Sequence, residues 1–232
     1  MNGLTRVANA MVSDEKRLEA ITSNLANAST PGFKRRLAAS HGEWVGRQGS
    51  QEIGLGISER NDFSQGMLQR TGNDLDLALE GEGFFSVEGP RGELYTRDGE
   101  FNLTSNGVLV TPEGFPVVWE SQAGNIQPTG APVTVSPDGT VSQGQAKLGK
   151  LKLVAFDNQN QLDNTSDGYW KAPATAVRNP ATGSVRQGHL EGANVNAIYE
   201  LVSMITVQRR FEQASQTMTQ IDQSYRRLHQ SR

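Results

Sequence analysis

The sequence has no cysteine, few aromatic residues and no long apolar run. Hydrophobic residues make up 35% of its 232 positions and aromatic residues 6%, against roughly 45–50% apolar residues in typical globular domains. Without cysteine, a disulfide, a thiolate metal site and a cysteine nucleophile are excluded. No stretch approaches the roughly 18 apolar residues of a membrane helix, and Met1–Arg17 lacks the apolar core of a signal peptide. We therefore expect a soluble protein without membrane insertion, which would leave the cytoplasm only by a route other than a cleaved signal.

No charge of one sign dominates the chain either. The formal net charge of -3 is too small to indicate a nucleic-acid partner. Residues 1–36 carry six lysines and arginines against three acids, and residues 190–232 carry five against four. The excess of negative charge therefore lies in the middle of the chain, whereas both ends carry a net positive charge.

Both ends show the apolar spacing of amphipathic helices. In the first 30 residues the stripe is interrupted once, at Asp14, and Pro31-Gly32 predicts the end of the helix. Its members are Leu4, Val7, Met11, Leu18, Ile21 and Leu25. The C-terminal stripe alternates spacings of three and four, through Met204, Val207, Phe211, Ala214, Met218, Ile221, Tyr225 and Leu228. Ile198, Leu201, Val202 and Ile205 widen it at the start.

Each stripe is too narrow for its helix to be stable alone in water. We therefore predict that the two terminal helices pack together as a coiled coil and are disordered in the free monomer.

The middle of the chain changes from a helical period to a period of two. Short β-type runs such as Phe84–Val87 and Lys147–Leu153 are separated by turn dipeptides such as Asn106-Gly107 and Asp138-Gly139, which are strong hairpin signals. The fold class predicted is α+β, with a central all-β domain of antiparallel hairpins over residues 64–189. Residues 37–63 are polar and glycine-rich and are predicted to be an extended connector. Residues 1–36 and 190–232 form the terminal helical domain.

Residues that could perform catalysis or bind a metal do not form a recognisable motif. His41, His189 and His229 lie far apart in the predicted elements, and no nucleophile elbow, Walker loop or His-Glu-x-x-His run is present. The acidic pairs Glu80/Glu82 and Asp74/Asp76 fit solvated strand faces better than a glycosidase pair. We expect no catalytic residue, no metal and no cofactor.

Five longer runs carry a family resemblance. They are Ser23–Arg35 (SNLANASTPGFKR), Leu75–Phe85 (LDLALEGEGFF), Tyr95–Phe101 (YTRDGEF), Gly188–Asn196 (GHLEGANVN) and Glu200–Ile205 (ELVSMI). In this order the runs resemble the bacterial flagellar axial proteins, the rod and hook subunits, over essentially the whole chain. The exposed domain is smaller than that of a hook subunit, and the short segment between the first helix and Gly66 favours a proximal rod protein over the alternative, a distal one.

The resemblance implies a structural subunit of the flagellar basal body. Its terminal helices would form the inner layer of a helical tube, which serves as drive shaft and export conduit across the periplasm, and the β domain would form the outer layer. Copies of the chain, other rod and hook axial proteins and the type III export apparatus would be the partners. We expect the assembly interface to comprise the stripe residues of both helices together with Asn24, Asn27, Phe33 and Leu201.

Two other classes of function remain open at this point. A β-rich recognition or adhesin module on a coiled-coil stalk would need an exposed aromatic platform, for which Trp44, Trp119 and Trp170 are the available tryptophans. An enzyme of carbohydrate metabolism would need a specific carboxylate pair. Both are less favoured than an assembly subunit.

Overall fold

The computed structural model describes residues 3–47, 50–166 and 168–230. The chain divides into two compact units, each built from segments that are distant in sequence. We call Met1–Ala28, Arg35–Asp62 and Val195–Arg232 the helical unit, and Ser29–Lys34 and Phe63–Asn194 the β-rich unit.

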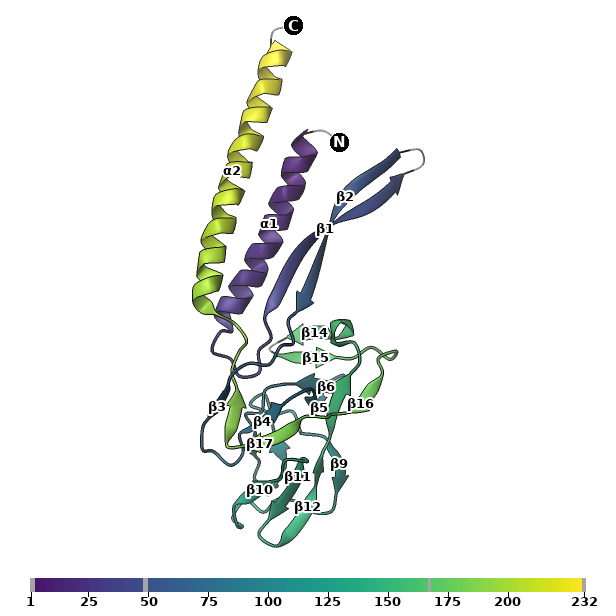
Figure 1. Cartoon of the computed structure of the whole chain (residues 1–232), viewed down its shortest axis with the longest axis vertical. Coiled ribbons are helices and arrows are strands. Elements are labelled where there is room, and N and C mark those ends of the chain that lie inside the picture. Colours follow the sequence, from purple (N-terminus) through teal and green to yellow (C-terminus); the bar gives the residue numbers. More distant parts are fainter. Residues whose placement is uncertain (1–2, 48–49, 167, 231–232) are drawn as a thin grey trace. The chain divides into compact units, whose positions relative to one another are not determined.

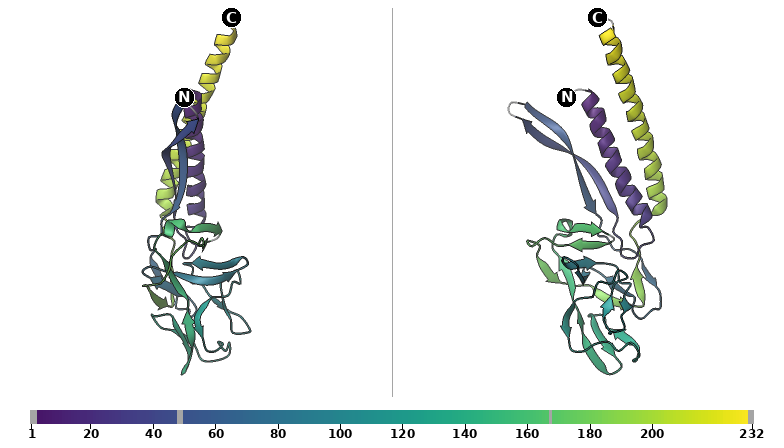
Figure 2. Two further views of the ribbon diagram at one scale, coloured as in Figure 1. Left: turned by 90° about the vertical axis from the view of Figure 1, so that its right-hand side faces the viewer. Right: turned by 180° about the vertical axis from the view of Figure 1, so that it is seen from behind.

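The helical unit contains helix α1 (Gly3–Ala26), helix α2 (Ala197–Gln230) and the strands β1 (Arg36–Arg47) and β2 (Ser50–Asn61). The two helices lie side by side and contact each other (Figures 1 and 2). Asn196 caps α2, since its side-chain oxygen accepts a hydrogen bond from the backbone N–H of Tyr199 at 3.1 Å. At the end of α1 the Asn27 side chain donates to the Ser23 carbonyl at 2.9 Å. The helix ends at Ala26, shortly before Pro31, as predicted.

Burial along α2 follows the predicted stripe. Between Met204 and Ser224, the residues that are not exposed are Met204, Val207, Phe211, Ala214, Met218 and Ile221. In α1, Ile21 is buried, Val7, Met11, Leu18 and Leu25 are half-buried, and Asp14 is buried as the polar interruption of the stripe. The prediction of a helix at each end of the chain is confirmed.

Residues 37–63, expected to be an extended connector, instead contain most of a long β-hairpin. Strands β1 and β2 pair antiparallel without a register shift from Arg36↔Asn61 to Arg47↔Ser50. Pairing satisfies the backbone polar groups of a segment whose composition alone suggested a loop. The glycines and polar residues concealed the strands, because hairpin pairing depends on backbone hydrogen bonds that composition does not report.

The β-rich unit is built from antiparallel strands, as predicted. Its largest sheet has the order β14-β15-β6-β5-β13-β16 and comprises β14 (Asp163–Ser166), β15 (Tyr169–Lys171), β6 (Gly92–Thr96), β5 (Phe84–Gly89), β13 (Leu153–Phe156) and β16 (Arg178–Pro180). A second sheet has the order β10-β11-β12-β9 and comprises β10 (Val133–Val135), β11 (Thr140–Gln143), β12 (Ala146–Leu151) and β9 (Trp119–Gln122).

Three two-stranded sheets complete the β-rich unit. They pair β17 (Ser184–Gln187) with β4 (Leu77–Glu80), β18 (His189–Glu191) with β3 (Leu68–Arg70), and β7 (Asn102–Leu103) with β8 (Leu109–Val110). A short 3-10 helix, η1 (Gln159–Gln161), precedes β14. Most strands of this unit, among them those of the four-stranded sheet, are labelled in Figure 1.

Neighbouring residues of the six-stranded sheet pack into two different cores. Phe85 belongs to a cluster with Leu77, Val141 and Leu151, whereas Phe84 packs in a second cluster with residues that include Trp170. Because successive strand residues point to opposite faces, the sheet is buried on both sides. This explains why its strands read as continuous apolar runs.

The run Lys147–Leu153, predicted as one alternating strand, is divided between the two sheets. Strand β12 ends at Leu151 in the four-stranded sheet, and β13 begins at Leu153 in the six-stranded one. Between them Lys152 donates its backbone N–H to the Val118 carbonyl at 3.0 Å. The pattern predicted strand structure here, but periodicity along one segment cannot report a change of partner strands.

Two Asp-Gly turns of the β-rich unit share one local geometry. Asp98 Oδ1 accepts the backbone N–H of Glu100 at 3.0 Å, and Asp138 Oδ1 accepts that of Thr140 at 3.1 Å. Burial raises the pKa of Asp98 to about 6, and nearby carboxylates such as Glu100 add to the shift. The pKa of the exposed Asp138 is lowered instead, chiefly by the hydrogen bond from the Thr140 hydroxyl. The two carboxylates should therefore respond to pH in opposite ways.

We predict that Asp98→Asn stabilises the β-rich unit above pH 6 by on the order of 2 kcal/mol, because an ionised Asp98 costs free energy in the folded state. An aspartate with a raised pKa binds its proton more tightly when folded, so wild-type stability should rise as pH falls from about 7 to 4. Urea unfolding across this range measures the effect. Asp138→Asn is the control and should show no stabilisation at neutral pH. Equal pH profiles for wild type and Asp98→Asn would contradict the prediction.

Candidate assembly surfaces

The side chain of Asn24 joins α1 to the first residue of β1. Its Oδ1 accepts the backbone N–H of Arg36 at 2.7 Å, and its Nδ2 donates to the Arg36 carbonyl at 2.9 Å. Asn24 is 1% exposed. The amide thus acts as a strand partner for Arg36 and fixes the start of the hairpin against the helix.

A second contact within the helical unit joins the segment before β1 to α2. Arg35 Nε donates to Glu200 Oε1 at 2.6 Å, and the Arg35 guanidinium lies 5.3 Å from the ring centroid of Tyr199. The Glu200 side chain is 1% exposed, whereas that of Arg35 is 26% exposed. A buried carboxylate is stable only with such a partner, so Arg35 and Glu200 hold the first turn of α2 in place.

The first two turns of α2 expose an apolar stripe, which is the second stripe found in the sequence. Its members Ile198, Leu201, Val202 and Ile205 are 50–75% exposed, and their spacing of three, four and seven residues places them on one face. Tyr199 beside them is 60% exposed. Within the described residues, this stripe is the longest run of exposed apolar side chains on a helix, and such faces mark interaction surfaces.

The structure places the predicted interface residues in three environments. The buried ones are Ile21, Asn24, Phe33 and Val207. The half-buried ones are Val7, Met11, Leu18, Leu25, Asn27, Met204, Phe211, Ala214, Met218 and Ile221. Leu201 is exposed, and the side chains of Leu4, Tyr225 and Leu228 lie outside the described set. Phe33 belongs to the β-rich unit, where its carbonyl accepts a hydrogen bond from Asn194 N–H.

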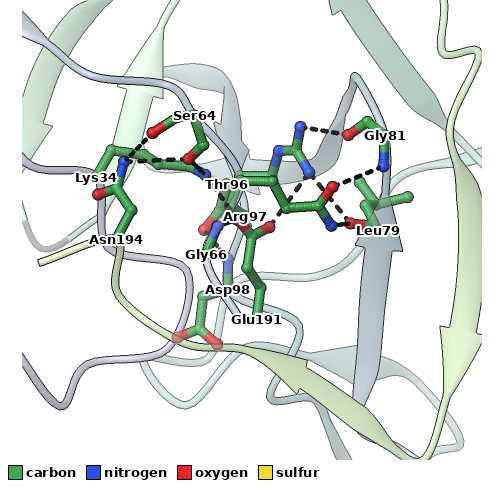
Figure 3. A network of polar contacts seen from close by, with 11 residues as sticks. Lys34, Ser64, Gly66, Leu79, Gly81, Thr96, Arg97, Asp98, Glu191 and Asn194 are labelled. Carbon is green, nitrogen blue, oxygen red and sulfur yellow. Dashed lines mark hydrogen bonds and ion pairs between the residues drawn. The ribbon is translucent and has the colours of Figure 1, made fainter. Parts of the chain in front are cut away.

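The β-rich unit is closed by a buried charge network around Glu191 (Figure 3). Lys34 Nζ lies 2.6 Å from Glu191 Oε1, and Arg97 Nη1 lies 3.2 Å from Glu191 Oε2. The three side chains are at most 4% exposed. The Glu191 carboxylate also accepts the backbone N–H of Gly66 at 2.8 Å. One side chain therefore joins four segments of this unit.

Each cation of the network has further acceptors. Lys34 donates to the Ser64 carbonyl at 2.8 Å, and Arg97 donates to the carbonyls of Leu79 and Gly81. Burial lowers the pKa of Arg97 from its ordinary value, although the nearby Glu191 carboxylate opposes that shift. The Asp98 carboxylate points away from these ion pairs (Figure 3). Charges buried in this way are tolerated because partners surround them.

Close backbone packing accompanies the network. Gly32, at φ +67°, donates its N–H to the Glu191 carbonyl at 2.6 Å. A Cβ at Gly32 would lie 2.3 Å from the Asp98 nitrogen. The segment Ser29–Lys34 thus enters the β-rich unit through a position that requires glycine.

Sequence reasoning assigned no role to Lys34, Arg97, Glu191 or Glu200. Each lies inside one of the runs that carry the family resemblance. Membership in these runs was the one feature of the sequence that could have indicated their role. Periodicity could not reveal them, because their partners are up to 165 positions away along the chain.

The alternative functions find less support in the geometry. Trp170 is 1% exposed inside the second core, and Trp119 is half-buried against the first, while the Trp44 side chain lies outside the described set. Glu80 is paired with Arg186 at 2.6 Å on the surface. Across the described residues no group of three acidic or histidine side chains could hold a metal ion. None of the described helices combines the length and apolar content needed to cross a bilayer.

We predict that Glu191→Gln destabilises the β-rich unit by about 3–5 kcal/mol, because it leaves Lys34 and Arg97 buried without their counter-charge. Adding Lys34→Met to this variant should cost less than the sum of the two single changes, since it removes one of the uncompensated cations. Glu80→Gln, at a surface pair, is the matched control and should change stability by less than about 1 kcal/mol. Chemical denaturation of the wild type and of the four variants, Lys34→Met alone included, measures these effects. Equal effects of Glu191→Gln and Glu80→Gln would contradict the role of the network.

Comparison with known proteins places these features in a family. Three family models match the chain: "Flagella basal body rod protein" over residues 7–34, "Flagellar hook protein FlgE/F/G D1 domain" over 78–143, and "Flagellar basal body rod FlgEFG protein C-terminal" over 186–230. The first match contains Asn24 and Lys34, the second Arg97, and the third Glu191 and Glu200.

Whole-length relatives agree with the family models. The flagellar basal-body rod protein FlgF of Caulobacter vibrioides is 34% identical over 211 residues, which cover 88% of this chain and 86% of the relative. FlgG of Buchnera aphidicola from Schizaphis graminum is 35% identical over 245 residues, covering 92% and 93%. FlgG of Agrobacterium fabrum is 33% identical over 255 residues, covering 96% of each. The chain belongs to the family of flagellar basal-body rod proteins, and it is a structural protein of the bacterial flagellum.

Proposed function

We propose that this chain is a non-catalytic structural subunit of the proximal rod of the flagellar basal body. It would assemble helically with copies of itself and other rod and hook axial proteins, to form part of the drive shaft and export conduit. The observation that carries this proposal is the exposed apolar stripe Ile198, Leu201, Val202 and Ile205 on a helix whose other stripe packs within the chain. A helix with two apolar faces is expected in a subunit in which one face packs inside the chain and the other binds a neighbouring subunit.

We propose that the domains of the chain form different layers of the rod. Residues 1–36 and 190–232 would provide the inner helical layer, in which α1 and α2 pack as a coiled coil. Residues 64–189 would form the outer layer, and residues 37–63 would connect the two. Asn24, Asn27 and Phe33 would contribute to assembly indirectly, since their described hydrogen bonds lie within the chain. A subunit of this kind would reach the periplasm-spanning rod through the type III export apparatus, without a cleaved signal peptide, membrane insertion or nucleic-acid partner.

The alignment lengths favour the FlgF type over the FlgG type. The alignments with FlgG run over 245 and 255 residues, which exceeds the 232 residues of the chain. Those relatives therefore contain residues without a counterpart here. The alignment with FlgF of Caulobacter vibrioides covers 88% of the chain over 211 residues. It therefore contains few positions at which the relative has a residue and this chain has none. A distal rod subunit of the FlgG type is the second candidate, supported by identities that are as high as that with FlgF.

We predict that a strain lacking this chain does not swim and that its basal bodies stop before the distal rod. Complementation with Met218→Asp should fail, because the charge would enter the half-buried stripe of α2. Gln216→Asp, at an exposed position of the same helix, is the matched control and should restore swimming. Soft-agar motility and electron microscopy of basal bodies measure both results. Normal rods with Met218→Asp would contradict the role of the stripe, and a proximal rod intact in the deletion strain would indicate the distal alternative.

A further inference from the structure

The two strands of the β1–β2 hairpin divide their backbone groups between an inner and an outer edge. In an antiparallel pair, hydrogen-bonded and non-hydrogen-bonded residue pairs alternate. The bond from Asp62 N–H to the Arg35 carbonyl, at 2.8 Å, makes Arg36↔Asn61 a non-hydrogen-bonded pair. The backbone groups of Arg36 and Asn61 therefore point away from each other, and every second pair along the hairpin does the same.

This register identifies the groups on the outer edge of β2. They are the N–H and C=O groups of Gln51, Ile53, Leu55, Ile57, Glu59 and Asn61. In the described part of the chain β1 and β2 form a two-stranded sheet, so no third strand pairs with the outer edge of β2. The strand is 12 residues long, against a typical strand length of about 5–6 residues.

The outer edge of β1 is closed at its start and open further along. At Arg36 the Asn24 amide occupies both outward groups. Beyond this point the hairpin leans away from α1 toward its tip (Figures 1 and 2). Along the outward groups of Ala38, Ser40, Gly42, Trp44 and Gly46 no further strand pairs with β1 in the described part of the chain. The hairpin therefore has two open edges, one on each side.

Natural proteins protect open edges, because an open edge pairs with other chains. The usual protections are short strands, bulges, prolines and charged side chains, lysine above all. Strand β2 contains no proline and no lysine, and its pairing with β1 has no register shift. Its charged residues, Glu52, Glu59 and Arg60, lie near its two ends and leave Ile53–Ser58 uncharged. An edge of this length, unprotected along its uncharged middle, is expected in a subunit that meets copies of itself.

We propose that the outer edge of β2 pairs with the outer edge of β1 in a second copy of this chain, so that hairpins of neighbouring rod subunits form one continuous sheet. The proposal rests on the proposed function as a rod subunit. Pairing of β2 with β1 is heterologous, so it leaves an open edge at each end and can continue from copy to copy. Pairing of β2 with β2 would be isologous and would close at a dimer, which cannot build a rod.

Proline at an outward position tests the edge without removing a bond inside the hairpin. Leu55 pairs with Gly42 in a non-hydrogen-bonded pair, so its N–H points outward. Leu55→Pro removes this donor and places the proline ring where the neighbouring strand would lie, while edge strands tolerate proline. Leu55→Ala shortens the side chain but keeps the N–H, which makes it the matched control.

In a strain lacking the chain, Leu55→Ala should restore rods, whereas Leu55→Pro should lower the number of rods per cell at least about tenfold. Rods formed equally well with both variants would overturn the edge pairing alone. Rods formed in the deletion strain without any complementing chain would overturn the proposed function, and the edge pairing with it.

Amide hydrogen exchange on the wild-type chain provides a readout that does not depend on the folding of a variant. In the full-length monomer, about half of the amides in Ser50–Asn61 should exchange fast, because they point outward. In purified basal bodies these amides should be protected at least about tenfold more strongly, because edge pairing would occupy them. Equal protection of the segment in the monomer and in basal bodies would overturn the proposal, since side-chain docking does not occupy outward N–H groups.

Discussion

The β-rich unit depends on one buried carboxylate, that of Glu191. Its two oxygens bind Lys34, Arg97 and the Gly66 N–H, and its own backbone carbonyl accepts the Gly32 N–H. These partners come from segments that are far apart in sequence, including the short insertion Ser29–Lys34. A buried charge is unfavourable unless all its partners are present. The carboxylate therefore makes the closure of the unit all-or-none, because losing one segment exposes an uncompensated charge in the others.

Closure of this unit has a consequence for the rest of the chain. Along the chain, α1 is followed by Ser29 of the β-rich unit, the hairpin segment lies between Lys34 and Phe63, and the α2 segment follows Asn194. The helical unit has its own connections, since Asn24 binds the backbone of Arg36 and Glu200 binds Arg35. In the described residues of this unit, the stripe on α2 is exposed and no third strand pairs with the outer edge of β2. Under the proposed function, the β-rich unit would be held together mainly by its own contacts, and the helical unit would be completed by neighbouring subunits.

The sequence predicted the features that depend on neighbouring residues, namely the terminal helices and the turns between strands. Spacing of Met204, Val207 and Phe211 predicted the buried side of α2, and turn dipeptides such as Asn106-Gly107 predicted antiparallel strands. The hairpin at Arg36–Asn61 was missed because glycine and polar residues conceal strands whose stability comes from pairing. Glu191 and Glu200 were missed as structural residues because ion pairs between distant segments leave no periodic signal. The division of Lys147–Leu153 between two sheets likewise depends on which strands pair, and not on the segment itself.

The central claim is that Glu191 unites distant segments into one cooperative unit, while the terminal helices gain their stability from assembly. Native-state hydrogen exchange on the full-length monomer tests both halves at once. The amides of Gly32, Gly66 and Gly192, which donate hydrogen bonds at the network or beside it, should open with the same free energy as the core strand β5. Amides of α1 and α2 should exchange with little protection. Gly32 and Gly66 amides that open separately, well below the free energy of β5, would contradict the account.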